Sequence, residues 1–202
     1  MPQPYPKHIK NPKLDIGAAA IKRPKHLMMG MHIISNHSQV DSMLALAFSN
    51  LLGSDPAPTI AILNSLRNGR IKREAMEALA KDVLDEEDMK VFRAVLSFSA
   101  SVEKERNRLA HWIWGIDDQI PDHVVLVNPS KVNKINTMVT VLKSKGNNNF
   151  EVSEVEEVME AIRKSCLVYS IANLQAIEHK MVQAVTAALN LEIYLGLSLI
   201  HI

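Results

Sequence analysis

The stretch that decides the fold is DEEDMKVFRAVLSFSASVEKERNRLAHWIWG, residues 85–115. Its first four residues are acidic, and the partial positive charge at the N-terminus of a helix favours acidic side chains there. Apolar residues then recur at steps of three and four along two neighbouring seams, which together form one broad face for burial. We predict one long helix that runs to Trp114 and ends at Gly115.

Hydrophobic spacing on both sides of this stretch predicts four further helices, over residues 24–52, 55–68, 71–84 and about 153–195. Local signals support where they begin. Pro24 suits a first helical turn, Asp55-Pro56 combines a cap with a first-turn proline, and Ser153 with Glu156 forms a capping box. The chain is therefore predicted to be all-α, with a bundle of about five helices.

Residues 117–145 interrupt the helical pattern and predict a small extended or β insert. The apolar run at 123–127 indicates a short strand or extended segment. Residues 131–143 are ambiguous, because the β-branched run at 137–141 could pair with that strand. Three asparagines at 147–149 predict a turn before the last helix.

The two ends of the chain differ from the middle. Residues 1–21 hold four of the nine prolines and few large apolar residues, and they are predicted to be a disordered, basic, proline-rich tail. Six Lys or Arg residues face one Asp within residues 1–26, so a solvated tail is the simple interpretation and a phosphate-binding arm the sharper one. A single domain is expected over residues 22–196. Residues 197–202 look like a translated sequencing-library adapter, so the natural protein is expected to differ after about Gly196, and His201 is given no functional weight.

Composition narrows the class of protein. The formal net charge of +1 gives no global argument for binding nucleic acid or a membrane. The single cysteine, Cys166, cannot form an intrachain disulfide and is interpreted as a small core residue, which fits a reducing compartment. We find no secretory signal, no apolar run near the length of a membrane span and no metal-ligand spacing, so a cytoplasmic protein without a metal or other cofactor is expected.

The segment that carries chemistry is Arg106-Asn107-Arg108-Leu109-Ala110-His111. It resembles the Arg-polar-x3-His motif of HEPN domains, which lies near the end of a long helix. Trp112-Ile113-Trp114-Gly115 is also similar to the residues immediately after that motif in some members of the family. The resemblance covers about ten residues in motif and roughly residues 25–190 in the order of elements.

The resemblance implies a specific activity. HEPN ribonucleases are helical, metal-independent and usually dimeric, and the motifs of two protomers face each other across a cleft. By this resemblance Arg106 would bind the scissile phosphate of RNA, Asn107 would orient the phosphate or the histidine, and His111 would act as general acid or base. The RNA 2′-hydroxyl would be the nucleophile and would leave a 2′,3′-cyclic phosphate. A toxin or defence effector is implied, working as a homodimer, with an antitoxin or a nucleotidyltransferase-like protein as a candidate partner.

The residue types suit these roles. Asn107 and His111 are four apart, so they lie one above the other on a helix, with Arg106 at the edge of the same patch. The planar fork of arginine matches a phosphate, and histidine transfers protons near neutral pH. Arg108 and Trp112 are weaker candidates for RNA contacts, through charge and base stacking.

Structural explanations compete with each of these roles. Arg106 could form an intrahelical ion pair with Glu103, and His111 could lie at a helix C-terminus only because the dipole favours it there. His32, Asn36, His37 and Asp41 are interpreted as the polar face of the first long helix, although they could line a site. Two alternatives to a ribonuclease therefore stay open. One is a non-catalytic HEPN-like module for dimerisation or for binding a nucleotide or protein, and the other is an unrelated helical protein.

Overall fold

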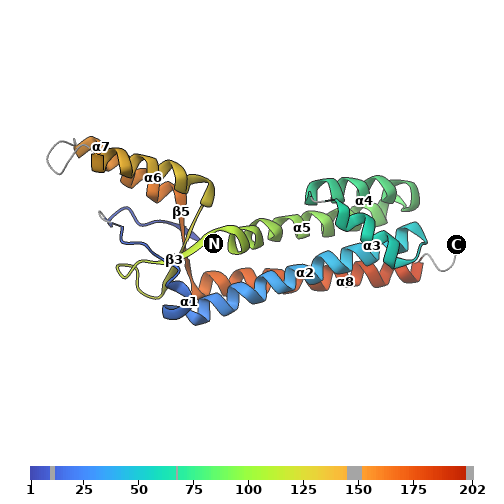
Figure 1. The fold of residues 1–202 in the computed structure, drawn as a ribbon. Helices are drawn as coiled ribbons and strands as arrows, with labels where there is room; N and C mark the ends of the chain where they lie inside the picture. The colour runs from blue at the N-terminus through green and yellow to red at the C-terminus, as the bar shows by residue number, and fades with distance from the viewer. Residues whose placement is uncertain (10–11, 67, 145–151, 199–202) are drawn as a thin grey trace. The chain divides into compact units, whose positions relative to one another are not determined.

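The computed structural model describes residues 1–9, 12–66, 68–144 and 152–198 (Figure 1). Over these residues the helices are α1 (Ala19–Lys22), α2 (Pro24–Leu52), α3 (Pro56–Ser65), α4 (Gly69–Val83), α5 (Glu86–His111), α6 (Pro129–Ser144), α7 (Val152–Ser165) and α8 (Ile171–Ser198). The strands are β1 (Gln3–Pro4), β2 (Asp15–Ile16), β3 (Ile113–Ile116), β4 (His123–Val127) and β5 (Cys166–Ser170).

The mainly helical class predicted from the sequence is confirmed, but the number of helices and the extent of the sheet differ from the prediction. The described residues form eight helices where about five were expected, and they add a five-stranded sheet. The expected turn at residues 147–149 and the end of the adapter-like segment, residues 199–202, lie outside the described residues.

Contacts within the chain group it into two compact units. We call Met1–His32 with Asn107–Ile177 the sheet unit, and Ile33–Arg106 with Glu178–Ile202 the helical unit. Helices α2, α5 and α8 each contain residues of both units. The expectation of one domain over residues 22–196 stays a prediction.

The sheet unit is built on an antiparallel sheet in the order β1-β5-β4-β3-β2. The central strand β4 pairs with β5 along its whole length, from His123 opposite Ser170 to Val127 opposite Cys166. Four consecutive β4 residues, Val124 to Val127, are buried. A strand that is covered on both faces has a continuous apolar run, and the run at 123–127 predicted this element correctly.

Two of the five strands lie where the sequence predicted helix. The long last helix, expected over about 153–195, is divided into α7, β5 and α8, and the helix expected to reach Trp114 ends at His111. The reason is tertiary. Segments 166–170 and 113–116 contain β-branched and aromatic residues that favour strands, and β4 pairs with all of the first segment and with Ile113 to Gly115 of the second. Cys166 lies in β5, where burial raises the pKa of its thiol to about 12.

After β4 the structure is helical where the sequence predicted an extended insert. The ambiguous segment 131–143 belongs to helix α6, so the extended insert predicted for residues 117–145 is wrong beyond β4. Pro129 is the first residue of α6, and Asn128 accepts a hydrogen bond from the backbone N–H of Ser130 at 3.0 Å. A capping asparagine followed by proline favours a helix start, and it outweighs the β-branched residues later in the segment.

The described part of the first 21 residues, 1–9 and 12–21, is not the disordered tail that the prolines suggested. Tyr5 and Ile9 are buried in the core of the sheet unit, and β1 and β2 form the two edges of the sheet. The buried carboxylate of Asp117 holds this segment. It accepts hydrogen bonds from the hydroxyl of Tyr5 and, at 2.7 Å, from the backbone N–H of Lys13.

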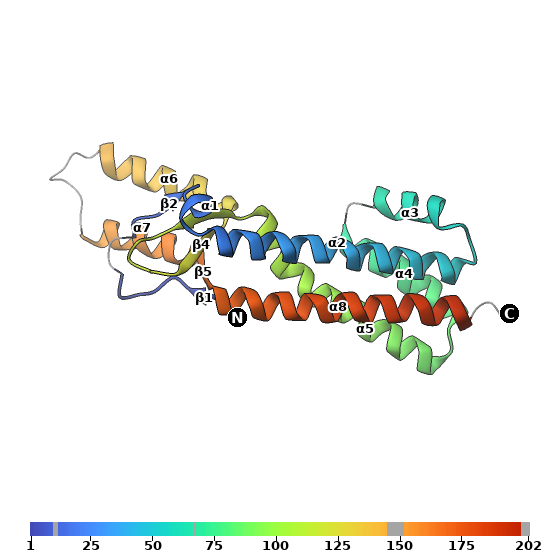
Figure 2. The ribbon, with the colours of Figure 1, turned by 90° about the horizontal axis from the view of Figure 1, so that it is seen from below.

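The helical unit is held by packing and by polar contacts between its helices. Asn50 of α2 donates a hydrogen bond to the carbonyl of Glu192 in α8 at 3.0 Å, and Tyr194 of α8 donates to Asp88 of α5 at 2.8 Å. The buried apolar residues of this unit include Val40, Ala47, Phe92, Leu96, Met181 and Leu195. In both views α2 and α8 run side by side over this unit (Figures 1 and 2).

Helix starts in this unit follow the predicted signals. Asp55 accepts a hydrogen bond from the backbone N–H of Ala57 at 2.9 Å and caps α3, with Pro56 as its first residue. Asp85 accepts from the backbone N–H of Asp88 at 2.9 Å at the start of α5. The acidic run therefore both caps the helix and complements its dipole.

One described helix, α8, is long and apolar enough to cross a membrane by length and composition alone. The core helix of a soluble protein meets the same criteria. Buried residues recur along α8 at steps of three and four, at Leu174, Ile177, Met181, Ala184, Ala188, Leu191 and Leu195. This spacing is typical of a helix with one face packed on protein, so α8 is not clearly a membrane span.

Candidate functional site

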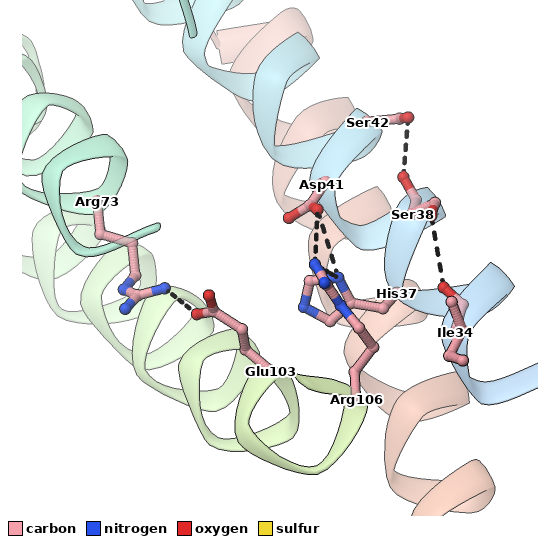
Figure 3. A network of polar contacts seen from close by, with 8 residues as sticks. All are labelled: Ile34, His37, Ser38, Asp41, Ser42, Arg73, Glu103 and Arg106. Carbon is pink, nitrogen blue, oxygen red and sulfur yellow. Dashed lines mark hydrogen bonds and ion pairs between the residues drawn. The ribbon is translucent and has the colours of Figure 1, made fainter. Parts of the chain in front are cut away.

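The polar part of the helical unit is centred on Arg106, on the last turns of α5. Its Nη2 lies 3.3 Å from Nδ1 of His37 and 3.8 Å from Oδ2 of Asp41, both on α2 (Figure 3). The Arg106 side chain is 25% exposed. Arg106 is therefore held by two side chains of a neighbouring helix while part of its side chain remains exposed.

His37 and Asp41 are four residues apart on α2, so they lie one above the other on the same helix face. Their side chains are 3.3 Å apart, between Nδ1 and Oδ2, and His37 is buried. Both Arg106 and Asp41 approach the same nitrogen. Without a proton on it, Nδ1 of His37 can accept a hydrogen bond from Arg106, and with a proton it can donate to Asp41 instead.

The carboxylate of Asp41 is electrostatically favoured in its charged form. Burial alone would raise its pKa. The hydrogen bond and charge of His37, with the charges of Arg106 and Lys72, outweigh burial and hold the pKa of Asp41 below its ordinary value. Asp41 is therefore an anion at neutral pH and a lasting partner for Arg106.

A second ion pair lies beside the first. Arg73 of α4 donates to Oε2 of Glu103 at 2.6 Å, so the alternative in which Glu103 pairs with Arg106 along α5 is wrong (Figure 3). Gly69, at the start of α4, makes room for this carboxylate. A Cβ added at Gly69 would lie 2.6 Å from Oε1 of Glu103.

The residues of both ion pairs line a pocket of about 120 Å³ within the helical unit. Its polar and charged lining residues are His37, Asp41, Asn64, Lys72, Arg73, Ser99, Glu103 and Arg106. Apolar side chains of α2, α3 and α4, such as Leu44, Leu63 and Met76, line the rest. Three cationic side chains thus face two carboxylates across one small cavity.

Asn107 and His111 belong to the sheet unit, whereas Arg106 belongs to the helical unit. All three are on α5, as the motif requires. Asn107 is half-buried, and His111, the last residue of the helix, is exposed. The negative end of the helix dipole favours a cation at this position.

Arg108 and Trp112 are brought together. The guanidinium carbon of Arg108 lies 5.8 Å from the centre of the Trp112 ring, which is a cation–π distance. Trp114 is packed instead. Its Nε1 donates to the carbonyl of Leu109 at 2.8 Å, and its ring meets Gly30, where a Cβ would come within 2.6 Å of it.

Sequence reasoning missed Lys72, Arg73 and Ser99. A signal for one of them was present, because the seam of Met89, Phe92 and Leu96 on α5 continues through Ser99, Glu103 and Arg106. A buried seam that becomes polar at helical spacing indicates a lined cavity. No comparable signal brings α4 to this place, since the contact joins residues about 30 apart in sequence.

Across the described residues, no three His, Cys, Asp or Glu side chains are grouped as metal ligands would be. Comparisons with protein-family models, curated proteins and solved structures found no significant match to the chain. The resemblance to HEPN domains therefore rests on the sequence alone.

Proposed function

We propose that this chain is a HEPN-like, metal-independent endoribonuclease that uses Arg106, Asn107 and His111 of α5. The observation that carries the proposal is that Arg106 is held in place by its neighbours and yet remains partly exposed. Its guanidinium contacts His37 and Asp41, its side chain is partly exposed, and it lines a pocket with more cations than carboxylates. Preorganised donors of this kind stabilise the charge that builds on a phosphate during cleavage.

The reaction proposed is attack of the RNA 2′-hydroxyl on the adjacent phosphorus, with the bond to the 5′-oxygen breaking. The 2′-hydroxyl loses a proton and the leaving 5′-oxygen gains one. His111 would carry one of these transfers, and its exposure on the last turn of α5 leaves it accessible to RNA. Arg108 stacked on Trp112 would add charge and an aromatic face for a base. A cytoplasmic toxin or defence effector acting as a homodimer, with an antitoxin or nucleotidyltransferase-like partner, belongs to the same proposal.

A second candidate function has an observation in its favour. Because Arg106 already contacts His37 and Asp41, its role could be to hold α5 against α2. The chain would then be a non-catalytic HEPN-like module that dimerises or binds a nucleotide or protein. In that case replacing Arg106 would lower stability, and the protein would not cleave RNA.

The test is cleavage of a mixed cellular RNA pool in excess EDTA by the wild type, His111→Ala and Arg106→Lys. His179→Ala is the matched control, because His179 is an exposed histidine on another helix, α8, and is not part of the motif. Cleavage that survives in His179→Ala and is lost in the other two variants supports the ribonuclease. A folded wild type that cleaves nothing favours the binding module. Cleavage that is unchanged in His111→Ala removes the motif from the reaction.

A further inference from the structure

The pocket beside Arg106 contains a buried hydroxyl that the ion pairs do not use. Ser99 is 5% exposed, and its Oγ has no hydrogen-bond partner among the described residues. Ser99 lies on α5 one turn before Glu103 and lines the pocket. A buried hydroxyl without a partner loses the free energy of a hydrogen bond, so such groups are rare and each needs an explanation, for which a bound ligand is one candidate.

The rest of the lining has more donors than acceptors. Each guanidinium carries five N–H donors and an ammonium carries three, while an ionised carboxylate only accepts and a neutral imidazole has one donor and one acceptor. Arg73 donates one N–H to Glu103, and Arg106 directs one nitrogen to His37 and Asp41. Lys72 adds a third positive charge, against the carboxylates Asp41 and Glu103. The pocket is therefore suited to an oxygen-rich anion.

We propose that this pocket is a phosphoryl subsite in which the Ser99 hydroxyl and the Lys72 ammonium, with the open side of Arg106, bind the non-bridging oxygens of a phosphate. A volume of about 120 Å³ is several times the roughly 10–15 Å³ that one water needs. A phosphate with its hydration therefore fits. The subsite rests on the proposed function only for the source of that phosphate, which would be RNA. Phosphate binding itself requires no cleavage.

The test uses three ligands, each of which represents one possible source of the phosphate. Inorganic phosphate tests a free anion, a 5′-phosphorylated 2′-O-methyl oligonucleotide tests an end phosphate, and the same oligonucleotide with a 5′-hydroxyl tests internal phosphodiesters. The 2′-O-methyl group blocks cleavage, so only binding is measured. Binding is measured by calorimetry for inorganic phosphate and by fluorescence anisotropy for the oligonucleotides, at fixed salt.

The variants are Ser99→Ala and Lys72→Gln, with a matched control for each. Ser101→Ala removes an exposed hydroxyl of α5, and Lys81→Gln removes an exposed ammonium of α4. Each pocket variant is expected to weaken binding of the preferred ligand roughly tenfold, and each control less than about twofold. Binding of any one of the three ligands with this pattern supports the subsite and names its source.

Thermal unfolding without ligand distinguishes a binding role from a structural one. Ser99→Ala removes an unsatisfied buried hydroxyl, so its melting temperature should equal or exceed that of the wild type while its binding falls. A folded wild type that binds none of the three ligands, or pocket variants that bind like their controls, would overturn the subsite. Phosphate binding by a protein that fails the RNA cleavage test would retain the subsite and remove the ribonuclease. RNA cleavage with an unchanged KM in both pocket variants would retain the ribonuclease and remove the subsite.

Discussion

At the scale of single residues, the position of the Arg106 side chain depends on how Nδ1 of His37 is shared. Arg106 and Asp41 both approach Nδ1 of His37, at 3.3 Å each. An arginine that is held on one side and open on the other is prepared for an anion without further ordering of its side chain. Since a guanidinium carries a large rotamer entropy, this prior ordering is a direct contribution to binding.

The charge of Asp41 gives a pH-dependent prediction. Its pKa is lowered in the folded protein, so its contribution to stability is complete above the unfolded pKa, near 3.9, and is lost as the pH falls through the folded pKa. Asp41→Asn should therefore lower the free energy of unfolding at pH 7. The loss should be below about 1 kcal/mol, because the side chain is half-exposed.

Urea unfolding at pH 7, 5 and 3 measures this difference. The gap between wild type and Asp41→Asn should narrow at pH 3, with Asp82→Asn, an exposed carboxylate on α4, as the control. A gap that widens towards low pH would show that Asp41 is not the stabilised anion inferred from its surroundings.

At the scale of elements, buried anchors decide which segments join the sheet. Asp117 is buried and accepts hydrogen bonds from Tyr5, from the backbone N–H of Lys13 and from the backbone N–H of Gln119. Burial would raise the pKa of Asp117, but these hydrogen bonds lower it below the ordinary value. One carboxylate thus connects the N-terminal segment to the turn after β3.

Breaking this anchor should release the N-terminal segment. Tyr5→Phe removes one donor to a buried carboxylate, and we expect it to lower the free energy of unfolding by about 1–3 kcal/mol. Hydrogen exchange at the Lys13 amide should accelerate in Asp117→Ala, which removes the acceptor of that amide. An amide that stays equally protected would mean that the segment is held by other contacts.

The packing of Trp114 against α2 gives another prediction for the sheet unit. Gly→Ala within a helix ordinarily gains about 0.5–1 kcal/mol, but a Cβ at Gly30 would lie 2.6 Å from the Trp114 ring. Gly30→Ala should therefore destabilise the protein, by about 1–3 kcal/mol.

Chemical denaturation of a double-mutant cycle tests this packing. Phenylalanine at position 114 lacks the outer ring atoms that would collide, so in a Trp114→Phe background the same Gly30→Ala change should cost less. Equal costs in the two backgrounds would contradict the contact.

At the scale of the whole molecule, the sequence predicts the structural features that depend on residues close together along the chain. Capped helices such as α3 and α5 begin where Asp55 and Asp85 place them. The sheet was missed because its pairings join distant segments, for example Gln3 opposite Val168. In the site, Arg106 was predicted and His37 with Asp41 were recognised only as a polar face. Ser99 continues the buried seam of α5, whereas the places of Lys72 and Arg73 depend on the contact between α4 and α5, which no local pattern indicates.

The most direct test of the ribonuclease is the chemistry of the ends that it leaves. A defined RNA is incubated with the protein in EDTA, and the fragments are weighed by mass spectrometry. Attack by the 2′-hydroxyl predicts a 2′,3′-cyclic phosphate on one fragment and a 5′-hydroxyl on the other, with no cleavage where the attacking position carries a 2′-O-methyl group. Fragments that end in a 3′-hydroxyl and a 5′-phosphate would contradict the proposed reaction, because they require attack by water with the 3′-oxygen leaving.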